Sequence, residues 1–218
     1  MPDTSPEQLN PWFSVWTQPR DTIQQIVEEN PEDMVLLLAV MPALMQWLYY
    51  VGISILSNLP LSSMSLAISI AAGVVLSIVF LYVNGAVTRW TGLWFGGHAR
   101  SENIRAAIAW SMVPAIAGLS LMLLGVALSG LTMHTEAQSA DWASRMTSFT
   151  QTVFMSLQCV TMLWSGVIYI NMLSQVQGFS IWKALGNALL SFLIIGFLAA
   201  AALVSLFIVV FETGYFKF

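Results

Sequence analysis

The residue types that carry most metal and acid–base chemistry are scarce in this sequence. His98 and His134 are the two histidines, and Cys159 is the single cysteine. A zinc site needs three or four converging ligands, and the topology predicted from hydropathy separates the two histidines by a membrane. We therefore expect no metal, no cofactor and, with one cysteine, no disulfide within the chain.

Motifs of enzymatic catalysis are also missing. The sequence contains no Gly-x-Ser-x-Gly, no phosphate-binding loop of the Walker type and no His-Glu-x-x-His. The pair Gly96-Gly97 lacks a following Gly-Lys-Ser/Thr, so it predicts a sharp turn rather than a phosphate cradle. We expect a protein that is not an enzyme.

Uncharged amide side chains do occur in apolar stretches. They are Gln46, Asn84, Gln158 and Asn171. Such amides either form hydrogen bonds between membrane helices or line a solvated cavity, and the sequence leaves both interpretations open. No Asp, Glu, Lys, Arg or His lies in the body of a predicted span. This argues against a proton-coupled pump, because proton relays are built from such groups.

The elements that position these residues are predicted to be membrane helices. Hydrophobic residues make up 57% of the chain and charged residues 8%, whereas soluble domains have about 25% charged residues. No charged residue occurs in 34–88, 106–135, 146–182 or 184–211. One crossing takes about 20 apolar residues, and a turn-rich break at 57–60 divides the first run. The sequence therefore predicts an all-α polytopic membrane protein, a bundle of five transmembrane helices over 34–211 with a tail at 212–218. The predicted spans are 34–56, 64–87, 106–131, 149–173 and 188–211.

The basic residues predict the orientation of the bundle. With the N-terminus in the cytoplasm, five of the seven lie on the cytoplasmic side, as the positive-inside rule requires. These five are Arg20, Arg89, Arg100, Arg105 and Lys183, against Arg145 and Lys217 on the other side. The sequence thus predicts a cytoplasmic N-terminus and a non-cytoplasmic C-terminus.

Prolines and small residues predict how the spans bend and pack. Pro42 and Pro114 are expected to kink their helices. Small residues recur every four positions on three spans, and such faces let helix backbones approach closely. They are Ser69, Gly73 and Ser77, then Gly125 and Ser129, then Gly196 and Ala200. Whether each partner helix belongs to the same chain or to a second copy stays open.

The segment before the first span, residues 1–33, is predicted to be cytoplasmic. Apolar residues at helical spacing predict a short amphipathic interfacial helix at 18–29, and its polar side is acidic, with Asp21, Glu28 and Glu29. One interpretation is that this helix packs on the ends of the spans, with Glu28 or Asp33 near Arg100 or Arg105. The other is that it forms a docking surface for a cytoplasmic protein.

Several short motifs together resemble the Yip family of Ypt/Rab-interacting membrane proteins. One is Asn10-Pro11-Trp12-Phe13 with the following segment 16–23, from Trp16 through Pro19 and Arg20. A second is Phe95-Gly96-Gly97 with Arg105 and the segment 109–114, which ends at Pro114. A third is 176–180, with Gly178 at its centre. The resemblance extends over nearly the whole chain from Asn10 and implies five spans with the N-terminus in the cytoplasm.

The resemblance implies a non-enzymatic membrane scaffold or organiser that acts through protein or lipid partners. Eukaryotic relatives act in traffic between the endoplasmic reticulum and the Golgi, and bind prenylated GTPases. The short N-terminal region is more similar to the bacterial branch, which implies the bacterial inner membrane, with the endoplasmic reticulum or Golgi as the alternative. The matched positions are candidates for partner binding or for shaping the fold: Trp12, Trp16, Pro19, Arg20, Gly97, Arg105, Pro114 and Gly178.

The expected partners are therefore membrane lipids, a further copy of this chain or a related one, and an unidentified cytoplasmic protein, with no nucleic acid. The alternative function is a small uncoupled transporter or channel for an ion, solute or lipid. That alternative requires Gln46, Asn84, Gln158 and Asn171 to converge on one cavity, because a pathway for a polar solute needs a continuous polar lining. Their placement in space separates the two hypotheses.

Overall fold

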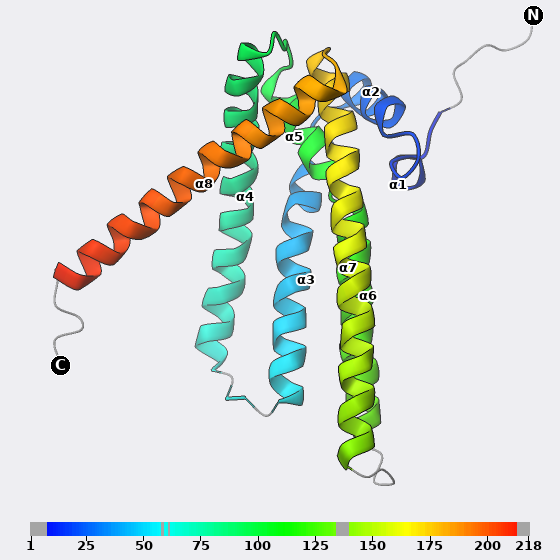
Figure 1. The fold of residues 1–218 in the computed structure, drawn as a ribbon, viewed down its shortest axis with the longest axis vertical. Coiled ribbons are helices and arrows are strands. Elements are labelled where there is room, and N and C mark those ends of the chain that lie inside the picture. Colours follow the sequence, from blue (N-terminus) through cyan, green and yellow to red (C-terminus); the bar gives the residue numbers. More distant parts are fainter. Residues whose placement is uncertain (1–7, 58, 61, 134–139, 213–218) are drawn as a thin grey trace, which may run out of the picture.

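The computed structural model describes residues 8–57, 59, 60, 62–133 and 140–212, and all regular elements in these ranges are helices (Figure 1). Two short helices precede the bundle, α1 (Pro11–Ser14) and α2 (Pro19–Glu29). The remaining helices are α3 (Val35–Leu56), α4 (Ser63–Trp94), α5 (Ser101–Trp110), α6 (Val113–Met133), α7 (Ala140–Gln177) and α8 (Ile181–Glu212). The prediction of an all-α membrane bundle is confirmed.

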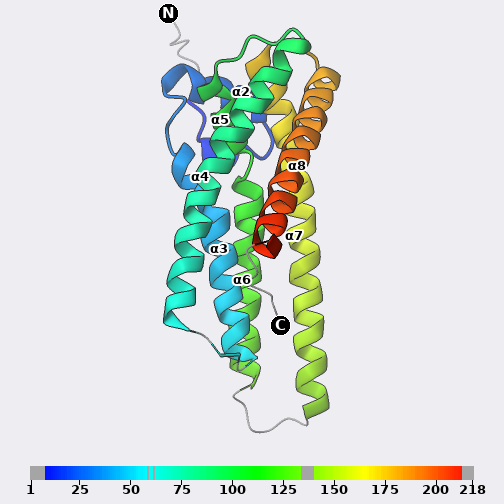
Figure 2. The ribbon, with the colours of Figure 1, turned by 90° about the vertical axis from the view of Figure 1, so that its left-hand side faces the viewer.

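Five helical segments are long and apolar enough to cross a membrane. Four of them lie within α3, α4, α7 and α8, and the third along the chain, Ser101–Gly130, combines α5 with most of α6. Consecutive spans run in opposite directions, as Figures 1 and 2 show. Helix α3 packs beside α4 and α6, and α6 packs beside α7. The helices α4, α7 and α8 extend several residues beyond the predicted spans. In α4 and α8, Arg89 and Lys183 end the apolar runs without ending the helices.

The third span is broken rather than kinked. The sequence predicts one helix with a bend at Pro114, but α5 ends at Trp110 and α6 begins at Val113. Proline lacks an N–H and its ring clashes with the carbonyl four residues earlier, here that of Trp110. The break leaves the first N–H groups of α6 without helical partners, and the Ser165 hydroxyl of α7 accepts one of them, from Ala115 N at 3.1 Å. Pro42, by contrast, lies inside a continuous α3.

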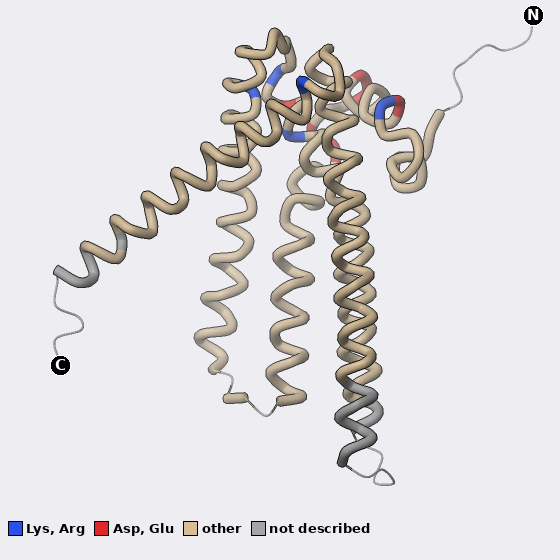
Figure 3. Tube along the Cα trace, in the orientation of Figure 1, with Lys and Arg blue, Asp and Glu red and all other residues tan. Residues whose placement is uncertain are grey.

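The Lys, Arg, Asp and Glu positions that are coloured in Figure 3 lie at one end of the bundle. We call this the charged end; it comprises α1, α2, α5, the loop of residues 95–100, the turn between α7 and α8, and the adjoining ends of α4 and α8. The main cluster of buried apolar residues lies here too. It contains Ile23 and Ile26 of α2, Trp110 of α5 and Met172 of α7. Helix α5 is buried among α2, α3, α4 and α7, so the end that carries the charges is also the most tightly packed part of the chain.

Small residues pack two pairs of spans together. On α4, Gly73 faces Ala43 of α3, and Ser69 accepts a hydrogen bond from the Trp47 indole N–H at 3.0 Å. On α6, a Cβ added at Gly125 would collide with the Phe154 ring of α7. On α8, a Cβ added at Gly196 would meet nothing within 4 Å. Two of the three predicted small-residue faces therefore pack within the chain, and the third does not.

Helix α8 leaves the bundle at an incline. It contacts α4 and α7, and its far end stands apart from α4 in Figure 1 and comes toward the viewer in Figure 2. Every side chain from Gly196 to Ser205 is exposed. The contacts that hold α8 are therefore concentrated near its start.

Candidate functional site

Trp12 and Trp16, two of the predicted site residues, lie on the outside of the charged end. Asn10 caps α1, because its side-chain oxygen accepts a hydrogen bond from Trp12 N at 3.1 Å. The Trp12 ring meets the buried Trp110 ring edge-on, with centroids 5.3 Å apart, and the Trp16 indole N–H donates to the Trp12 carbonyl at 3.1 Å. Phe13 points away and is 76% exposed. The two tryptophans thus hold α1 against the bundle and leave Phe13 available.

Two side-chain hydrogen bonds tie helix α2 to α7. Pro19 stands at its first turn, where proline needs no N–H partner. The Arg20 guanidinium donates through Nη2 to the Ser174 hydroxyl at 2.9 Å, and the Gln175 amide donates to Gln24 at 3.0 Å. Together with the buried Ile23 and Ile26, these contacts show that the inner face of α2 packs on the spans, as one of the two interpretations predicts.

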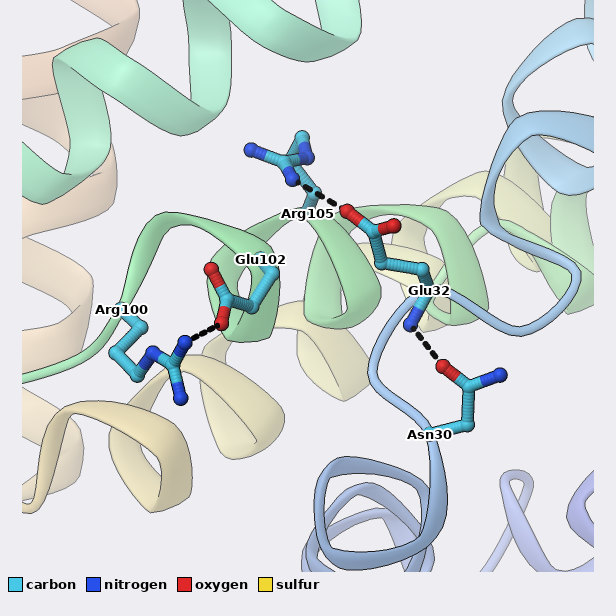
Figure 4. Close-up of polar contacts among 5 residues, drawn as sticks. All are labelled: Asn30, Glu32, Arg100, Glu102 and Arg105. Carbon is cyan, nitrogen blue, oxygen red and sulfur yellow. Dashed lines mark hydrogen bonds and ion pairs between the residues drawn. The ribbon is translucent and has the colours of Figure 1, made fainter.

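Two ion pairs at the charged end involve Glu32 and Glu102. The Arg105 guanidinium lies 3.0 Å from the Glu32 carboxylate, and Arg100 lies 2.6 Å from Glu102 (Figure 4). We expected Glu28 or Asp33 near these arginines, and the carboxylates that pair with them are those of Glu32 and Glu102. Helix α2 ends at Glu29, and Asn30 accepts a hydrogen bond from Glu32 N. That turn directs Glu32 toward α5.

Arg105 makes a second contact that positions α5. Its guanidinium carbon lies 4.6 Å from the centre of the Tyr82 ring on α4. A Cβ at Gly85 would come within 2.9 Å of Arg105 Cγ, so Gly85 leaves room for the arginine stem. The Arg105 side chain is 15% exposed, whereas that of Glu32 is 68% exposed. The stack on Tyr82 therefore orders the guanidinium more than the ion pair with Glu32 does.

Gln177 joins the loop of residues 95–100 to the α7–α8 turn, and the sequence did not indicate this role. Its backbone carbonyl accepts from His98 N and its side-chain oxygen accepts from Ala99 N, both at 3.3 Å. Gly97 fits against it because a Cβ there would collide with the amide, and Gly178 ends α7 with φ +72°. Gly96, with φ +82°, makes the predicted sharp turn. Gly97 and Gly178 therefore shape this junction.

A second polar junction, between α4 and α8, was also missed. Thr91 donates to the Asn187 side-chain oxygen at 2.6 Å and lies 2.8 Å from the Ser191 hydroxyl. The Asn187 amide in turn donates to the Thr88 carbonyl at 3.2 Å, and all four side chains are buried. These bonds join residues about 100 positions apart and fix where α8 crosses α4. Ordinary Thr, Ser and Asn residues in a helix carry no sequence signal for such pairing.

The outer face of α2 is acidic and hollowed. Asp21, Glu28 and Glu29 are exposed and, with Gln24, line a cavity of about 460 Å³. The two ion pairs found in the described part of the chain include none of these three carboxylates. The helix is thus held from one side while its charges face outward.

The four amides proposed as cavity-lining residues lie in separate places. Gln46 is exposed on α3, and the Gln158 side chain is directed at Gly118 between α6 and α7. Asn171 lies beside Trp16 and donates to the Val167 carbonyl of its own helix. Asn84 lies between α4, α7 and α8. They do not line one cavity.

Three further predictions concern metal ligands, the C-terminal tail and Pro114. Among the described residues, no three His, Cys, Asp or Glu side chains come close enough to hold a metal ion. His134 and residues 213–218 of the predicted tail lie outside the described residues. Pro114 lies at the start of α6, where it breaks the third span.

Comparison with known proteins places this fold in a family. The model of the Yip1 domain family matches residues 13–203, which is most of the chain. Neither the search of curated proteins nor that of solved structures finds a match. The matched range begins at Phe13 of α1 and extends into α8, so it includes both polar junctions and all five spans. The chain belongs to the Yip1 domain family.

Proposed function

We propose that this Yip1-domain protein is a non-enzymatic membrane scaffold that binds a cytoplasmic protein partner at its charged end. The observation that carries the proposal is the two-sided construction of α2. Its inner face is held to α5 and α7 by buried apolar residues and by the Arg20–Ser174 hydrogen bond. Its outer face presents Asp21, Glu28 and Glu29 around a hollow.

The chemistry of this face indicates the kind of partner. Three carboxylates without an ion pair among the described residues attract a basic segment, and the exposed Phe13 ring of α1 offers apolar contact area. An anionic membrane surface would repel the same face. The face is therefore suited to a protein carrying Lys or Arg residues rather than to the lipid surface.

The orientation follows from the positive-inside rule. Arg20, Arg89, Arg100, Arg105 and Lys183 belong to the charged end, and short loops with excess Lys and Arg stay in the cytoplasm. We infer that the charged end faces the cytoplasm of the cell and that α8 runs away from it. This orientation supports a cytoplasmic partner.

The arrangement of the amides favours a scaffold over a channel. A solute pathway requires polar groups that line one continuous cavity. Gln46, Asn84, Gln158 and Asn171 instead lie on different helix faces, and Asn171 is bonded within its own helix. The scaffold is the function that these contacts support best.

A site-specific photoreactive amino acid tests the proposed partner face in native membranes. At Gln24, on the acidic hollow, the account predicts a discrete protein adduct. At Leu163, which is 75% exposed on α7, it predicts lipid adducts alone. Combining Asp21→Asn, Glu28→Gln and Glu29→Gln removes the adduct at Gln24. Asp33→Asn, an exposed carboxylate outside the hollow, is the matched control and leaves the adduct in place.

Two outcomes contradict the proposal. One is a protein adduct at Gln24 that survives the triple substitution, because the carboxylates would then not recognise the partner. The other is selective solute flux through vesicles that contain the purified protein, because a scaffold leaves the bilayer tight.

A further inference from the structure

An apolar groove lies where α8 diverges from the bundle. It has a volume of about 340 Å³ between α4, α7 and α8. Its walls include Phe80 of α4, Ile170 of α7, and Phe192 and Gly196 of α8. The polar junction formed by Thr91, Asn187 and Ser191 holds the helices together on one side. Beyond that junction the α8 side chains become exposed, so the groove is open to the surroundings of the spans.

One unsatisfied polar group distinguishes this groove. The Asn84 side-chain oxygen accepts a hydrogen bond from the Thr88 hydroxyl at 3.1 Å. Asn84 lines the groove, and its NH₂ group has no hydrogen-bond partner in the described part of the chain. An amide donor left unpaired beside apolar walls is unfavourable. A ligand that brings an acceptor oxygen to this position would satisfy it.

The depth of Asn84 in the membrane identifies that acceptor. Arg105 stacks on Tyr82 and its stem lies against Gly85, so Asn84 is level with the Arg105–Glu32 ion pair. Charged side chains of this kind lie at the membrane boundary rather than in the hydrocarbon. Below this level, α4 continues toward Ser63 through uncharged residues. The amide therefore lies at the layer of the lipid glycerol esters, and the groove extends from it toward the acyl chains.

We propose that the groove binds one acyl chain of an ester-linked membrane phospholipid and that Asn84 donates a hydrogen bond to its ester carbonyl. The apolar walls exclude water and contact the chain, while the amide selects a lipid with an acceptor at its upper end. This lipid site is separate from the acidic face of α2 and does not depend on the protein partner proposed for that face.

A neighbouring groove shows why the amide matters. A second apolar groove, of about 330 Å³, lies between α3, α4 and the α5–α6 break. Its serine, Ser77, already donates to the Gly73 carbonyl at 2.8 Å. Lipid chains can fill that groove without any selection. The α4–α7–α8 groove alone, of these two, combines apolar walls with an unpaired donor.

Two glycines provide a matched pair of variants for the test. A Cβ at either Gly196 or Gly166 would meet no atom within 4 Å, so both positions can accept a larger side chain. Gly196 lines the groove, whereas Gly166 is exposed on α7 outside it. Gly196→Leu fills the groove from α8, and Gly166→Leu adds the same side chain elsewhere.

The experiment uses the full chain in vesicles with an ester-linked phospholipid that carries a photoactivatable group in one acyl chain. Cross-linked peptides are located by mass spectrometry. We expect adducts on the groove-lining segments of α4 and α8 that fall about fivefold in Gly196→Leu and remain unchanged in Gly166→Leu. Equal adducts in both variants would overturn the site and leave only ordinary lipid contact.

A second arm tests the hydrogen bond. The same probe with ether-linked chains lacks the acceptor carbonyl, and the account predicts about three- to tenfold fewer adducts in the wild type. Asn84→Leu removes this preference, and so does Asn84→Asp, which keeps the oxygen that Thr88 donates to but lacks the NH₂. Equal labelling by ester and ether probes in the wild type would overturn the role of Asn84.

Discussion

The charged end and the far part of α8, residues 196–205, are held in opposite ways. At the charged end, Arg20, Gln177 and Asn187 each bond to a residue at least 78 positions away in sequence. Along 196–205, every side chain is exposed. Both parts are rich in apolar residues, so hydrophobicity does not account for the difference.

The difference follows from what drives helix association in lipid. Leucine gains about as much from contact with a lipid chain as from contact with another leucine. Apolar surface alone therefore does not bring membrane helices together. Polar side chains and close backbone approach do. Between Ser191 and Ser205, α8 has no polar side chain, and from Ser191 onward it separates from α4. In the described part of α8, the junction at Ser191 is followed by side chains that are exposed from Gly196 to Ser205.

The strongest test of this comparison substitutes a glycine in each region. A Cβ at Gly92 would collide with the Gln177 amide and lie 3.2 Å from Asn187 Nδ2. Gly92→Ala should therefore reduce the free energy of unfolding by about 1–3 kcal/mol through overpacking. Gly196→Ala should be neutral or raise it by up to about 1 kcal/mol, since alanine is the better helix former. Unfolding in mixed detergent, followed by circular dichroism, measures both, and equal losses would show that the two regions are alike.

The next test measures the polar junction between α4 and α8. Thr91→Val and Asn187→Leu each remove one side of the 2.6 Å hydrogen bond. A double-mutant cycle should give a coupling energy of about 0.5–1.7 kcal/mol. Ser205→Ala is the comparison in the far part of α8. Its hydroxyl donates to the Ala201 carbonyl of the same helix, so its removal should leave stability unchanged. A coupling energy of zero would mean that other contacts hold α8.

The smallest expected effect concerns the surface charges. Glu32→Gln breaks the ion pair with Arg105, but Glu32 is 68% exposed. The loss should be about 0–1 kcal/mol and should shrink as salt is added. Arg105 keeps its stack on Tyr82 in this variant. A large, salt-independent loss would show that the charged end depends on charge pairing rather than on its buried contacts.

Much of the architecture could be predicted from the sequence, and particular residues show where prediction stopped. Long uncharged runs reveal spans because lipid excludes charge. The length of such a run reflects the thickness of the lipid core rather than the length of the helix. Helix α4 therefore continues past Arg89, and α8 begins before Lys183. Pro114 indicated a disturbance, but whether its helix would bend or break depended on whether the freed N–H groups could find a partner, and Ser165 provides one.

The candidate site was predicted less completely. The motif residues Trp12, Arg20, Gly97, Arg105 and Gly178 do gather at the charged end. Their partners Trp110, Ser174 and Gln177 come from α5 and α7. No local pattern in the sequence pairs segments so far apart, because such pairing is decided by how whole helices pack. The groove beside Asn84 was unpredictable for the same reason.

We propose that the charged end lies in cytoplasmic water and the far part of α8 in lipid. Replacing the native thiol by Cys159→Ala allows single cysteines at Gln24 and Phe197, both exposed, to be probed with a membrane-impermeant maleimide. The account predicts that Gln24→Cys reacts in inside-out vesicles and is protected in right-side-out ones, while Phe197→Cys reacts in neither. Reaction of Gln24→Cys from outside, or equal reaction at Phe197→Cys, would contradict it.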